Sequence, residues 1–400
     1  MGANFMRWSK RAEAIQQSIT LAITAKANEM KENSIDVISF SAGEPDFNTP
    51  ENIIQAAIDA MKNGYTKYTA TNGILPLRKA ICEKFKNDNG LEYNPSQIVV
   101  STGAKQSLEN TFLAILNEGD EVIVSTPYWV TYPELISLAG GVPVYFNGEK
   151  QNGYNYTKEG LEKLISKNTK AILLNSPNNP TGSVYSEGEL KDIAALAEKC
   201  KLLIISDEMY EKLVYGGEKH ISIASISKDA YDRTIVINGL SKSYAMTGWR
   251  LGYAAASEKI AKLMTNIQSH MTSNTSSITQ YAAVEALTGP QDTINAMVVE
   301  FEKRRNYMVQ TLENIKDVSI IKPEGAFYIM VNINCAIGKE YNGKKVTDSV
   351  SFASILLDEE NVAVIPGKAF GLENYIRLSY ATSMDNIKEG LKRIKRFIEK

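Results

Sequence analysis

The chain has 400 residues, of which 44% are hydrophobic and 22% charged, and its formal net charge is -2. This length predicts two or three lobes, and the composition is typical of a soluble folded protein. The charge argues against a nucleic-acid binder, which needs clustered Lys and Arg. No stretch has the roughly 18 apolar residues of a membrane span, and the N-terminal segment lacks the features of a secretory or myristoylation signal. We expect a cytoplasmic enzyme.

The cysteines and histidines limit the chemistry further. Cys82, Cys200 and Cys335 are odd in number and far apart, so we expect reduced core thiols rather than a disulfide framework. The two histidines, His220 and His270, have no Cys or carboxylate spacing around them that is typical of a zinc or iron site, so no metal is predicted. Scarce histidine leaves proton transfer to Lys, Tyr or a carboxylate and favours a cofactor.

The chain begins with a polar arm and a predicted helix over about 35 residues, which lead to an apolar segment at Val37–Phe40. From about residue 97 to 256, short apolar segments alternate with helical patterns, which predicts a mostly parallel sheet covered by helices. The strand candidates are rich in Val, Ile or Leu, as expected for strands buried on both faces. They are Gln97–Ser101, Glu121–Ser125, Ala171–Asn175, Leu202–Ser206, Thr234–Asn238 and Leu251–Ala255.

After about residue 285 the pattern changes. Charged helical segments at Val298–Asn314 and Ser349–Glu360 are mixed with strand-like segments at Phe327–Asn332 and Tyr375–Ser379. This mixture predicts a second, smaller α+β lobe, with which Val37–Phe40 can pair.

Lys242 lies in the segment NGLSKSYAMTGWRLGY, after the strand candidate Thr234–Asn238. A lysine at a strand end is usually only solvated. Here small and polar neighbours predict a turn at the carboxyl end of the strand, where open α/β sheets bind ligands. Arg250 follows in the same segment and can reach an anion beside the amine. A lysine desolvated near another cation has a lowered pKa and can act as a Schiff-base nucleophile.

Three other segments follow strands of the same predicted sheet. Ser101–Lys105 joins a strand to the helical pattern Gln106–Leu116, and its Gly103 would let a phosphate approach the free amides of a helix N-terminus, although ordinary helix caps look similar. Asp207 would need a cationic partner once buried, such as a protonated pyridine nitrogen; the alternative is that it caps a following helix. Segment 175–182, NSPNNPTG, is by itself only a turn.

Together these segments resemble the PLP-dependent fold-type I aminotransferases, specifically the class I family with the bacterial aspartate aminotransferases of the Ib subgroup. The matching motifs extend over almost the whole chain in the family's order: SAGEPDF (41–47), YTATNG (68–73), STGAKQSL (101–108), PYWVTYPE (127–134), NSPNNPTG (175–182), SDEMY (206–210), SKSYAMTGWR (241–250) and RLSYA (377–381). The resemblance implies an α/β fold with a seven-stranded, mostly parallel sheet in a large PLP-binding domain (45–285). A smaller domain (286–400) would be completed by an N-terminal arm (1–44).

The resemblance also implies the cofactor contacts. Lys242 would hold PLP as a Schiff base, Asp207 would pair with the pyridinium nitrogen, and Asn179 and Tyr210 would donate to the phenolic oxygen. The remaining contacts are the phosphate ligands Gly103, Ala104, Lys105 and Arg250, the stacking Trp129, and Tyr68, which would reach the cofactor of a neighbouring subunit. The family therefore implies a homodimer with shared active sites.

For the substrate, the resemblance implies that Arg377 binds the α-carboxylate, helped by Trp129, Asn179 and the backbone at Gly43. Lys105 stands where this subgroup contacts a side-chain carboxylate, which favours aspartate with 2-oxoglutarate in a ping-pong reaction in which Lys242 moves the proton. An aromatic or alanine-type aminotransferase is the alternative, followed by a PLP-dependent C–S lyase and, outside enzymes, a transcription regulator with this domain.

Two positions depart from the family pattern. Gly239 stands where many relatives have a phosphate-binding serine, and Ser241 is a possible substitute. Gln16 stands where relatives that accept prephenate have a basic residue, so prephenate is not expected as a substrate.

Overall fold

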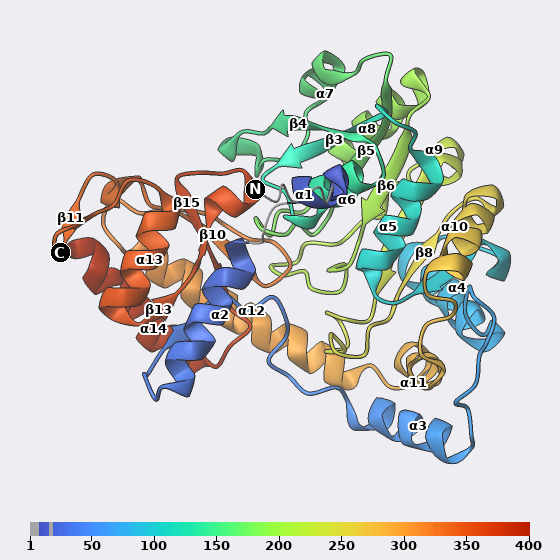
Figure 1. Cartoon of the computed structure of the whole chain (residues 1–400), viewed down its shortest axis with the longest axis horizontal. Coiled ribbons are helices and arrows are strands. Elements are labelled where there is room, and N and C mark those ends of the chain that lie inside the picture. Colours follow the sequence, from blue (N-terminus) through green and yellow to red (C-terminus); the bar gives the residue numbers. More distant parts are fainter. Residues whose placement is uncertain (1–7, 16–18) are drawn as a thin grey trace, which may run out of the picture.

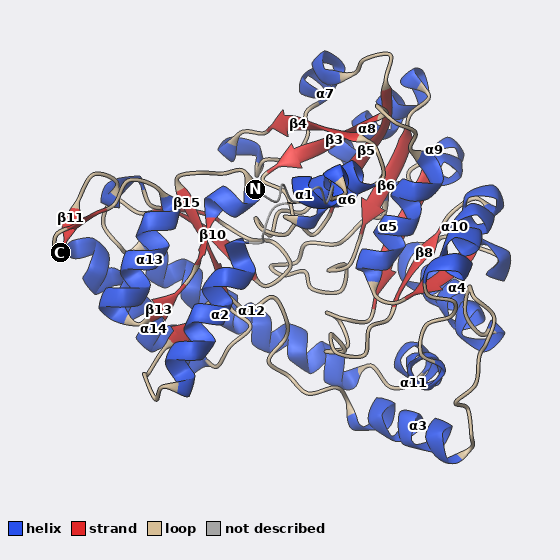
Figure 2. Ribbon diagram, in the orientation of Figure 1, coloured by secondary structure: helices blue, strands red, loops and turns tan. Residues whose placement is uncertain are grey.

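The computed structural model describes residues 8–15 and 19–400, and its largest layer is a seven-stranded sheet (Figures 1 and 2). In spatial order the strands are β2 (Ile98–Ser101), β8 (Gly252–Ala255), β7 (Thr234–Gly239), β6 (Leu203–Asp207), β5 (Thr169–Asn175), β3 (Glu121–Thr126) and β4 (Val142–Asn147). Only β8 runs antiparallel to its neighbours. The prediction of a mostly parallel sheet is therefore confirmed.

Helices cover both faces of this sheet because successive strand residues point to opposite faces. Ile205 of β6 belongs to a buried cluster with α5 (Ala104–Ile115), α6 (Thr131–Leu138) and α10 (Glu258–Met271), whereas Ile204 packs with α7 (Lys158–Leu164), α8 (Glu187–Cys200) and α9 (Lys228–Arg233). Around β2 and β8, the core is closed by α3 (Glu51–Lys62), α4 (Leu75–Asn89) and α11 (Ser277–Thr288). Burial on both faces explains the continuous apolar runs in these strands.

The strand β4 was not predicted from the sequence. It is the edge strand, where Pro143 is tolerated because one side of an edge strand needs no ladder hydrogen bond. Only Phe146 of this strand is buried, so β4 lacks the apolar run that marks the central strands.

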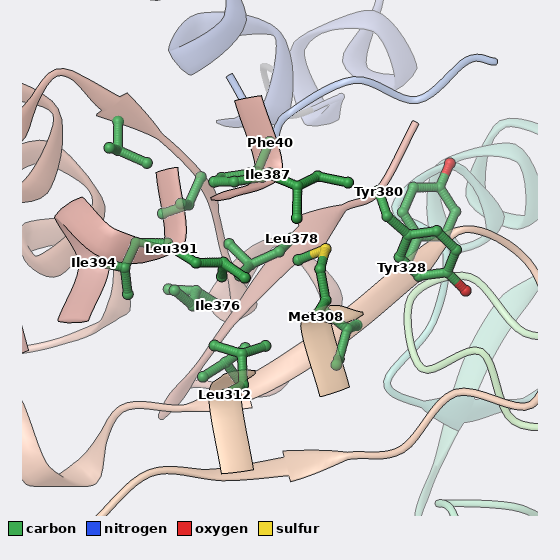
Figure 3. Packing of buried hydrophobic residues seen from close by; sticks show 14 of the residues in the cluster. Phe40, Met308, Leu312, Tyr328, Ile376, Leu378, Tyr380, Ile387, Leu391 and Ile394 are labelled. Carbon is green, nitrogen blue, oxygen red and sulfur yellow. The ribbon is translucent and has the colours of Figure 1, made fainter. Parts of the chain in front are cut away.

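A second group of elements follows in the C-terminal part. Its four-stranded antiparallel sheet has the order β14 (Ile365–Pro366), β15 (Tyr375–Ser379), β10 (Tyr328–Asn332) and β9 (Ser319–Ile321). The associated helices are α12 (Asp292–Glu313), α13 (Ser349–Glu360) and α14 (Met384–Glu399), and a hairpin is formed by β11 (Glu340–Tyr341) and β12 (Lys344–Lys345). Figure 3 shows the core between this sheet and helices α12 and α14. A smaller α+β unit is thus present, while the domain boundaries at 45 and 286 stay a prediction.

The N-terminal segments join this smaller unit. Strand β1 (Ile38–Ser39) pairs in parallel with β13 (Val362–Ala363), as expected for Val37–Phe40, and Phe40 is part of the core in Figure 3. Helix α2 (Ile19–Glu32) packs beside them, and the short α1 (Lys10–Ala14) has no buried residue. Gln16, discussed above for prephenate, lies outside the described residues.

Two further expectations concern thiols and membranes. All three cysteines are free, as predicted, but each is only partly buried rather than in the core. Within residues 8–15 and 19–400, no helix is long and apolar enough to cross a membrane.

Candidate active site

A cavity of about 670 Å³ lies where the carboxyl edge of the large sheet meets the smaller unit. The edge brings together the ends of β5, β6 and β7 and the start of β8, because these parallel strands point the same way and β8 runs against them. The smaller unit contributes Tyr328 of β10 and Arg377 of β15. Ligands are expected at such an edge of an open α/β sheet.

Lys242 places an amine in this cavity. It follows β7 in the turn predicted from the sequence, and its Nζ donates a hydrogen bond to the carbonyl of Gly43. Burial lowers the pKa of Lys242 to about 8, with Arg377 and Arg250 contributing repulsion and Glu44 and Asp207 opposing them. A nucleophilic amine needs this shift, because only the unprotonated form attacks a carbonyl.

Asp207 is the last residue of β6 and is buried at the cavity wall. Burial raises the pKa of its carboxyl from 3.8 to about 6, although hydrogen bonds from the Tyr132 hydroxyl (2.7 Å, to Oδ2) and the Met209 amide (3.2 Å, to Oδ1) oppose the shift. The following residues form a turn rather than a helix, so the alternative that Asp207 caps a helix is wrong.

The N-terminus of α5 and Arg250 form one corner of the site. Gly103 caps the helix with a φ of 81°, and a Cβ on it would come within 2.4 Å of an Arg250 guanidinium nitrogen. Glycine is required there because both the backbone conformation and the close guanidinium exclude a side chain. Ala104 and Lys105 in the first helical turn also line the cavity, so amides and a guanidinium converge as in an anion site.

Arg377 is buried on the opposite side. Its Nη1 donates to the side-chain oxygen of Asn179 (2.9 Å), and its guanidinium carbon lies 4.2 Å from the ring centroid of Tyr328. Among the described residues its Nε has no hydrogen-bond partner. A buried guanidinium with an unused donor can receive a carboxylate in its fork.

The aromatic residues Tyr210, Tyr328 and Trp129 also line the cavity. The hydroxyls of Tyr210 and Tyr328 are 3.0 Å apart. The Lys105 ammonium lies 5.2 Å from the ring centroid of Trp129, and burial together with Arg250 lowers the pKa of this lysine. The predicted residues Gly43, Trp129, Asn179 and Tyr210 therefore share one cavity with Lys242 and Asp207.

Comparison with known proteins assigns this geometry to a family. The profile for "Aminotransferase class I and II" matches residues 35–394. The chain is 52% identical to an aspartate aminotransferase of Bacillus sp. (strain YM-2), over 98% of this chain and 99% of that protein, and 51% identical to that of Bacillus subtilis, over 99% and 100%. The chain belongs to the class I and II aminotransferases. The expectation of an aminotransferase is confirmed.

Solved structures agree with this family. The aspartate aminotransferase of Rhizobium meliloti superposes with a TM-score of 0.95 at 42% identity, over 98% of this chain and 99% of that one. The Thermus thermophilus aspartate aminotransferase with maleate superposes at 0.91 and 40% identity, over 98% and 100%. These matches confirm the predicted fold class.

Two predicted residues do not line the cavity of this aminotransferase chain. Gly103 is one of them, and it lies against the Arg250 guanidinium, as described above. The side chain of Tyr68 is 91% exposed and is not among the described residues around the cavity. Tyr68 is therefore not brought to the site within this chain.

The structure explains the departure at Gly239. A Cβ there would lie 2.9 Å from both Gly252 Cα and Met209 Cε, so a serine would need the surrounding chain to move. Ser241 is buried and lines the cavity beside Lys242. It is therefore placed to contribute a hydroxyl that Gly239 lacks.

Sequence reasoning missed several residues of the site. Tyr328 lies in a segment predicted as a strand, and its alternation with buried neighbours gave no sign that it faces a ligand. Tyr132 stands in the quoted motif PYWVTYPE, but its bond to Asp207 joins residues 75 positions apart. Such contacts depend on the pairing of helix α6 with the sheet rather than on local pattern.

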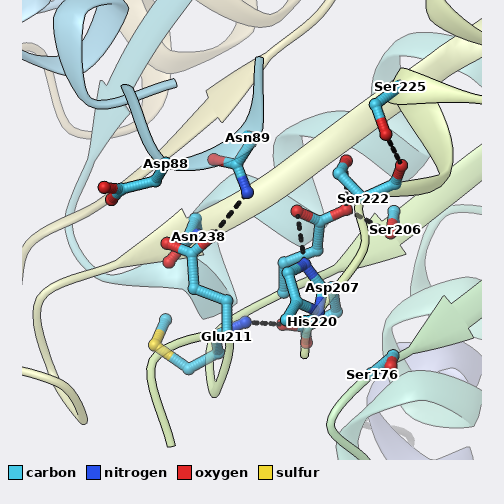
Figure 4. Close-up of polar contacts among 12 residues, drawn as sticks. Asp88, Asn89, Ser176, Ser206, Asp207, Glu211, His220, Ser222, Ser225 and Asn238 are labelled. Atoms are coloured by element: carbon cyan, nitrogen blue, oxygen red, sulfur yellow. Dashed lines mark hydrogen bonds and ion pairs between the residues drawn. The ribbon is translucent and has the colours of Figure 1, made fainter. Parts of the chain in front are cut away.

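A polar cluster behind Asp207 was also missed (Figure 4). Ligand atoms of Glu208, Glu211 and His220 lie within 4.8 Å of one another, and His220 Nε2 approaches Glu208 Oε2 to 3.1 Å without the geometry of a hydrogen bond. The buried ammonium of Lys84 pairs with Glu211, which also accepts a bond from Asn89 (3.0 Å). Because a lysine already supplies the positive charge, we describe this cluster as an ion-pair network.

Proposed function

We propose that this aminotransferase uses PLP to move an amino group between aspartate and 2-oxoglutarate in a ping-pong reaction. The proposal depends on one observation: a single cavity is lined by an amine with a lowered pKa, Lys242, a buried carboxylate, Asp207, and a buried guanidinium with an unused donor, Arg377. In such a reaction Lys242 would supply the amine, Asp207 would pair with the ring nitrogen of the cofactor, and Arg377 would bind the carboxylate of the substrate.

The chemistry of the donor set fits PLP. Asp207 offers a carboxylate to the ring nitrogen, and Ala104, Lys105 and Arg250 offer amides and a guanidinium to the phosphate. We assign Ser241 as a further phosphate contact that replaces the serine absent at Gly239. When bound, PLP supplies an electron sink for the electron pair left by removal of the substrate α-proton.

Asn179 and Tyr210 would face the phenolic oxygen. The Asn179 side-chain oxygen already accepts from Arg377, so its NH₂ remains available as a donor. The Tyr210 hydroxyl can use Tyr328 as either donor or acceptor. Both groups would therefore stabilise negative charge at this oxygen, while Trp129 would cover one face of the ring.

Lys242 would have two tasks. It would hold the cofactor covalently, and as a free amine it would take the substrate α-proton as a general base and give it back as a general acid. A pKa of about 8 suits both directions, since it is close to neutral pH and the proton is neither held too tightly nor too weakly.

The substrate would be held at both ends. Arg377, with Gly43 and Asn179 nearby, would bind the α-carboxylate, and Lys105 would bind the side-chain carboxylate. Two comparisons support a dicarboxylate: the Bacillus relatives are named aspartate aminotransferases, and the Thermus thermophilus structure is one with maleate.

A panel of amino donors tests the substrate. With 2-oxoglutarate as acceptor, kcat/KM for aspartate should exceed those for tyrosine and alanine, and Lys105→Ala should lower it for aspartate by about tenfold or more, as for one lost charge-assisted hydrogen bond. Lys345→Ala, an exposed lysine of β12, is the matched control. Preference for tyrosine or alanine, unaffected by Lys105→Ala, would favour the aromatic or alanine-type alternative.

We also propose a homodimer with shared sites, in which Tyr68, which is almost fully exposed and does not line the cavity of its own chain, would reach the cofactor of the other subunit. Mixing inactive Lys242→Ala protein with a Tyr68→Ala variant after subunit exchange should restore activity above either parent. Light scattering that shows a monomer, with full activity, would contradict the shared site.

A further inference from the structure

Tyr132 connects the two protein groups that would hold the cofactor ring. It lies in the first turn of α6 (Thr131–Leu138), buried in the core between the sheet and its helices. Its hydroxyl donates to Asp207 Oδ2 at 2.7 Å, and its ring packs edge-on against Trp129, with centroids 5.3 Å apart and planes at 82°. Within residues 8–15 and 19–400, no other tyrosine makes both contacts.

Asp207 needs this donor because its surroundings oppose its charge. Burial is the largest influence and raises the pKa of the carboxyl, and the neighbouring charge of Glu208 raises it further. The two direct hydrogen bonds, from Tyr132 and from the Met209 amide, act in the opposite direction. A carboxylate can accept several donors, so both can bond to Asp207 while the cavity side stays available to a ligand.

The edge-on packing has a separate consequence. Both rings line the cavity, but Trp129 is only partly buried, whereas Tyr132 is 2% exposed and belongs to the buried cluster between the sheet and its helices. Edge-to-face pairs are favourable because the positive ring edge meets the negative ring face. The buried Tyr132 ring can therefore hold the Trp129 ring in place.

We propose that Tyr132 is a positioning residue of the cofactor site: its hydroxyl holds Asp207 as a carboxylate directed at the ring nitrogen, while its ring supports Trp129. The inference rests on the proposed function, because both supported residues act on PLP. Tyr132 itself has no contact with substrate in this assignment. Its effect on the reaction passes entirely through Asp207 and Trp129.

Tyr132→Phe separates the two contacts, since phenylalanine keeps the ring against Trp129 and removes only the hydroxyl. Tyr156→Phe is the matched control. Tyr156 is equally buried, and its hydroxyl donates to the Leu173 carbonyl at 2.7 Å on the same sheet, so its loss removes a buried hydrogen bond that does not involve Asp207. Both variants should lose a similar amount of thermal stability.

The test uses holoenzyme reconstituted with PLP labelled with ¹⁵N in the ring. The ¹⁵N chemical shift reports whether the ring nitrogen is protonated, which a purely structural role of Tyr132 would not change. In Tyr132→Phe we expect the ¹⁵N shift at neutral pH to move toward that of an unprotonated nitrogen, because Asp207 without its donor is a stronger base and competes for the shared proton. We also expect kcat to fall about 10- to 100-fold, with KM for aspartate nearly unchanged. Tyr156→Phe should leave both unchanged.

Incorporation of 3-fluorotyrosine at position 132 gives a second variant that preserves the packing if Tyr132→Phe does not fold. Its more acidic hydroxyl is a stronger donor and makes Asp207 a weaker base, so the ¹⁵N shift should move toward that of the protonated nitrogen. An unchanged ¹⁵N shift in a folded Tyr132 variant, or an equal change in Tyr156→Phe, would overturn the proposal. Failure of wild type to bind labelled PLP would instead reject the proposed function.

Discussion

Asp207 ends β6 and Glu211 lies in the turn that follows; both are buried, yet their pKa values shift in opposite directions. Burial raises the pKa of Asp207 to about 6. At Glu211 burial acts the same way, but the ammonium of Lys84, with help from His220 and Asn89, outweighs it and lowers the pKa to about 2. Figure 4 shows both residues, and Glu211 accepts a hydrogen bond from Asn89.

The difference lies in what each carboxylate contacts. Glu211 has a buried cation of its own, so its charge is balanced within the chain. The direct hydrogen bonds to Asp207 come from neutral donors, the Tyr132 hydroxyl and the Met209 amide. A buried carboxylate is costly without a cationic partner. We infer that Asp207 is arranged for a positive group that arrives with a ligand, whereas Glu211 belongs to the structure of the turn.

The largest expected effect on activity is that of replacing Lys242. Lys242→Ala should lower transamination by about 10⁴-fold or more and remove the visible absorption of bound cofactor, because it deletes both the covalent anchor and the proton carrier. Steady-state kinetics and an absorption spectrum measure the two effects. Lys345→Ala should behave like wild type, and an active, coloured Lys242→Ala protein would refute the assignment.

A direct comparison of the two carboxylates follows. Asp207→Asn should lower kcat by about 10³-fold, because an amide cannot hold the ring nitrogen protonated as a carboxylate does. Glu211→Gln should leave kcat of the folded enzyme within a few-fold of wild type. Kinetics at saturating aspartate on both variants decides this. If Glu211→Gln were as inactive as Asp207→Asn, the separation between cavity and network would be wrong.

The network should instead show its importance in stability. Lys84→Met leaves Glu211 buried without its cation, and we expect the free energy of unfolding to fall by about 3–5 kcal/mol, as for other broken buried pairs. Urea unfolding of the holoenzyme measures the change. The double variant Lys84→Met with Glu211→Gln should recover part of it, since no unpaired charge remains. A loss below about 1 kcal/mol, the value of an exposed pair, would contradict the network.

The same contrast explains what the sequence could and could not predict. Six of the seven strands of the large sheet carry apolar runs, and Lys242, Asp207 and Asn179 stand at their carboxyl ends, where topology alone brings them together. The edge strand β4 lacks such a run and was missed. The resemblance to the family supplied Arg377 and Tyr68, which no local pattern singles out.

The remaining features of the site could not be predicted from the sequence because they depend on contacts between distant segments. The Lys84–Glu211 pair joins α4 to the turn after β6, and His220 reaches it from a later loop, so the absence of a ligand-like spacing around His220 concealed a cluster of three possible ligand groups. Gly239 was recognised as a departure, but only the packing of Gly252 and Met209 shows why a serine does not fit. Side-chain neighbours across elements are fixed by packing, which sequence periodicity does not encode.

The smallest expected effect is the pH dependence of stability that Asp207 gives the cofactor-free protein. Its folded pKa, about 6, lies above the value of 3.8 for a free carboxyl, so its favourable contribution is complete below pH 3.8 and is lost as pH rises through 6. Between these values the free energy of unfolding of wild type should fall by about 2–3 kcal/mol relative to Asp207→Asn. Glu211 acts in the opposite sense and at lower pH, since its depressed pKa makes its contribution disappear only as pH falls from 4.5 toward 2.

Urea unfolding of both cofactor-free proteins at several pH values from 4 to 7 measures this difference. Saturating PLP should abolish it, because a ring nitrogen that carries a proton gives Asp207 the cation that Lys84 gives Glu211. Without cofactor, parallel pH profiles of the free energy of unfolding for wild type and Asp207→Asn would mean that the charge of Asp207 is already balanced within the chain. The contrast between Asp207 and Glu211 would then no longer support a ligand contact at Asp207.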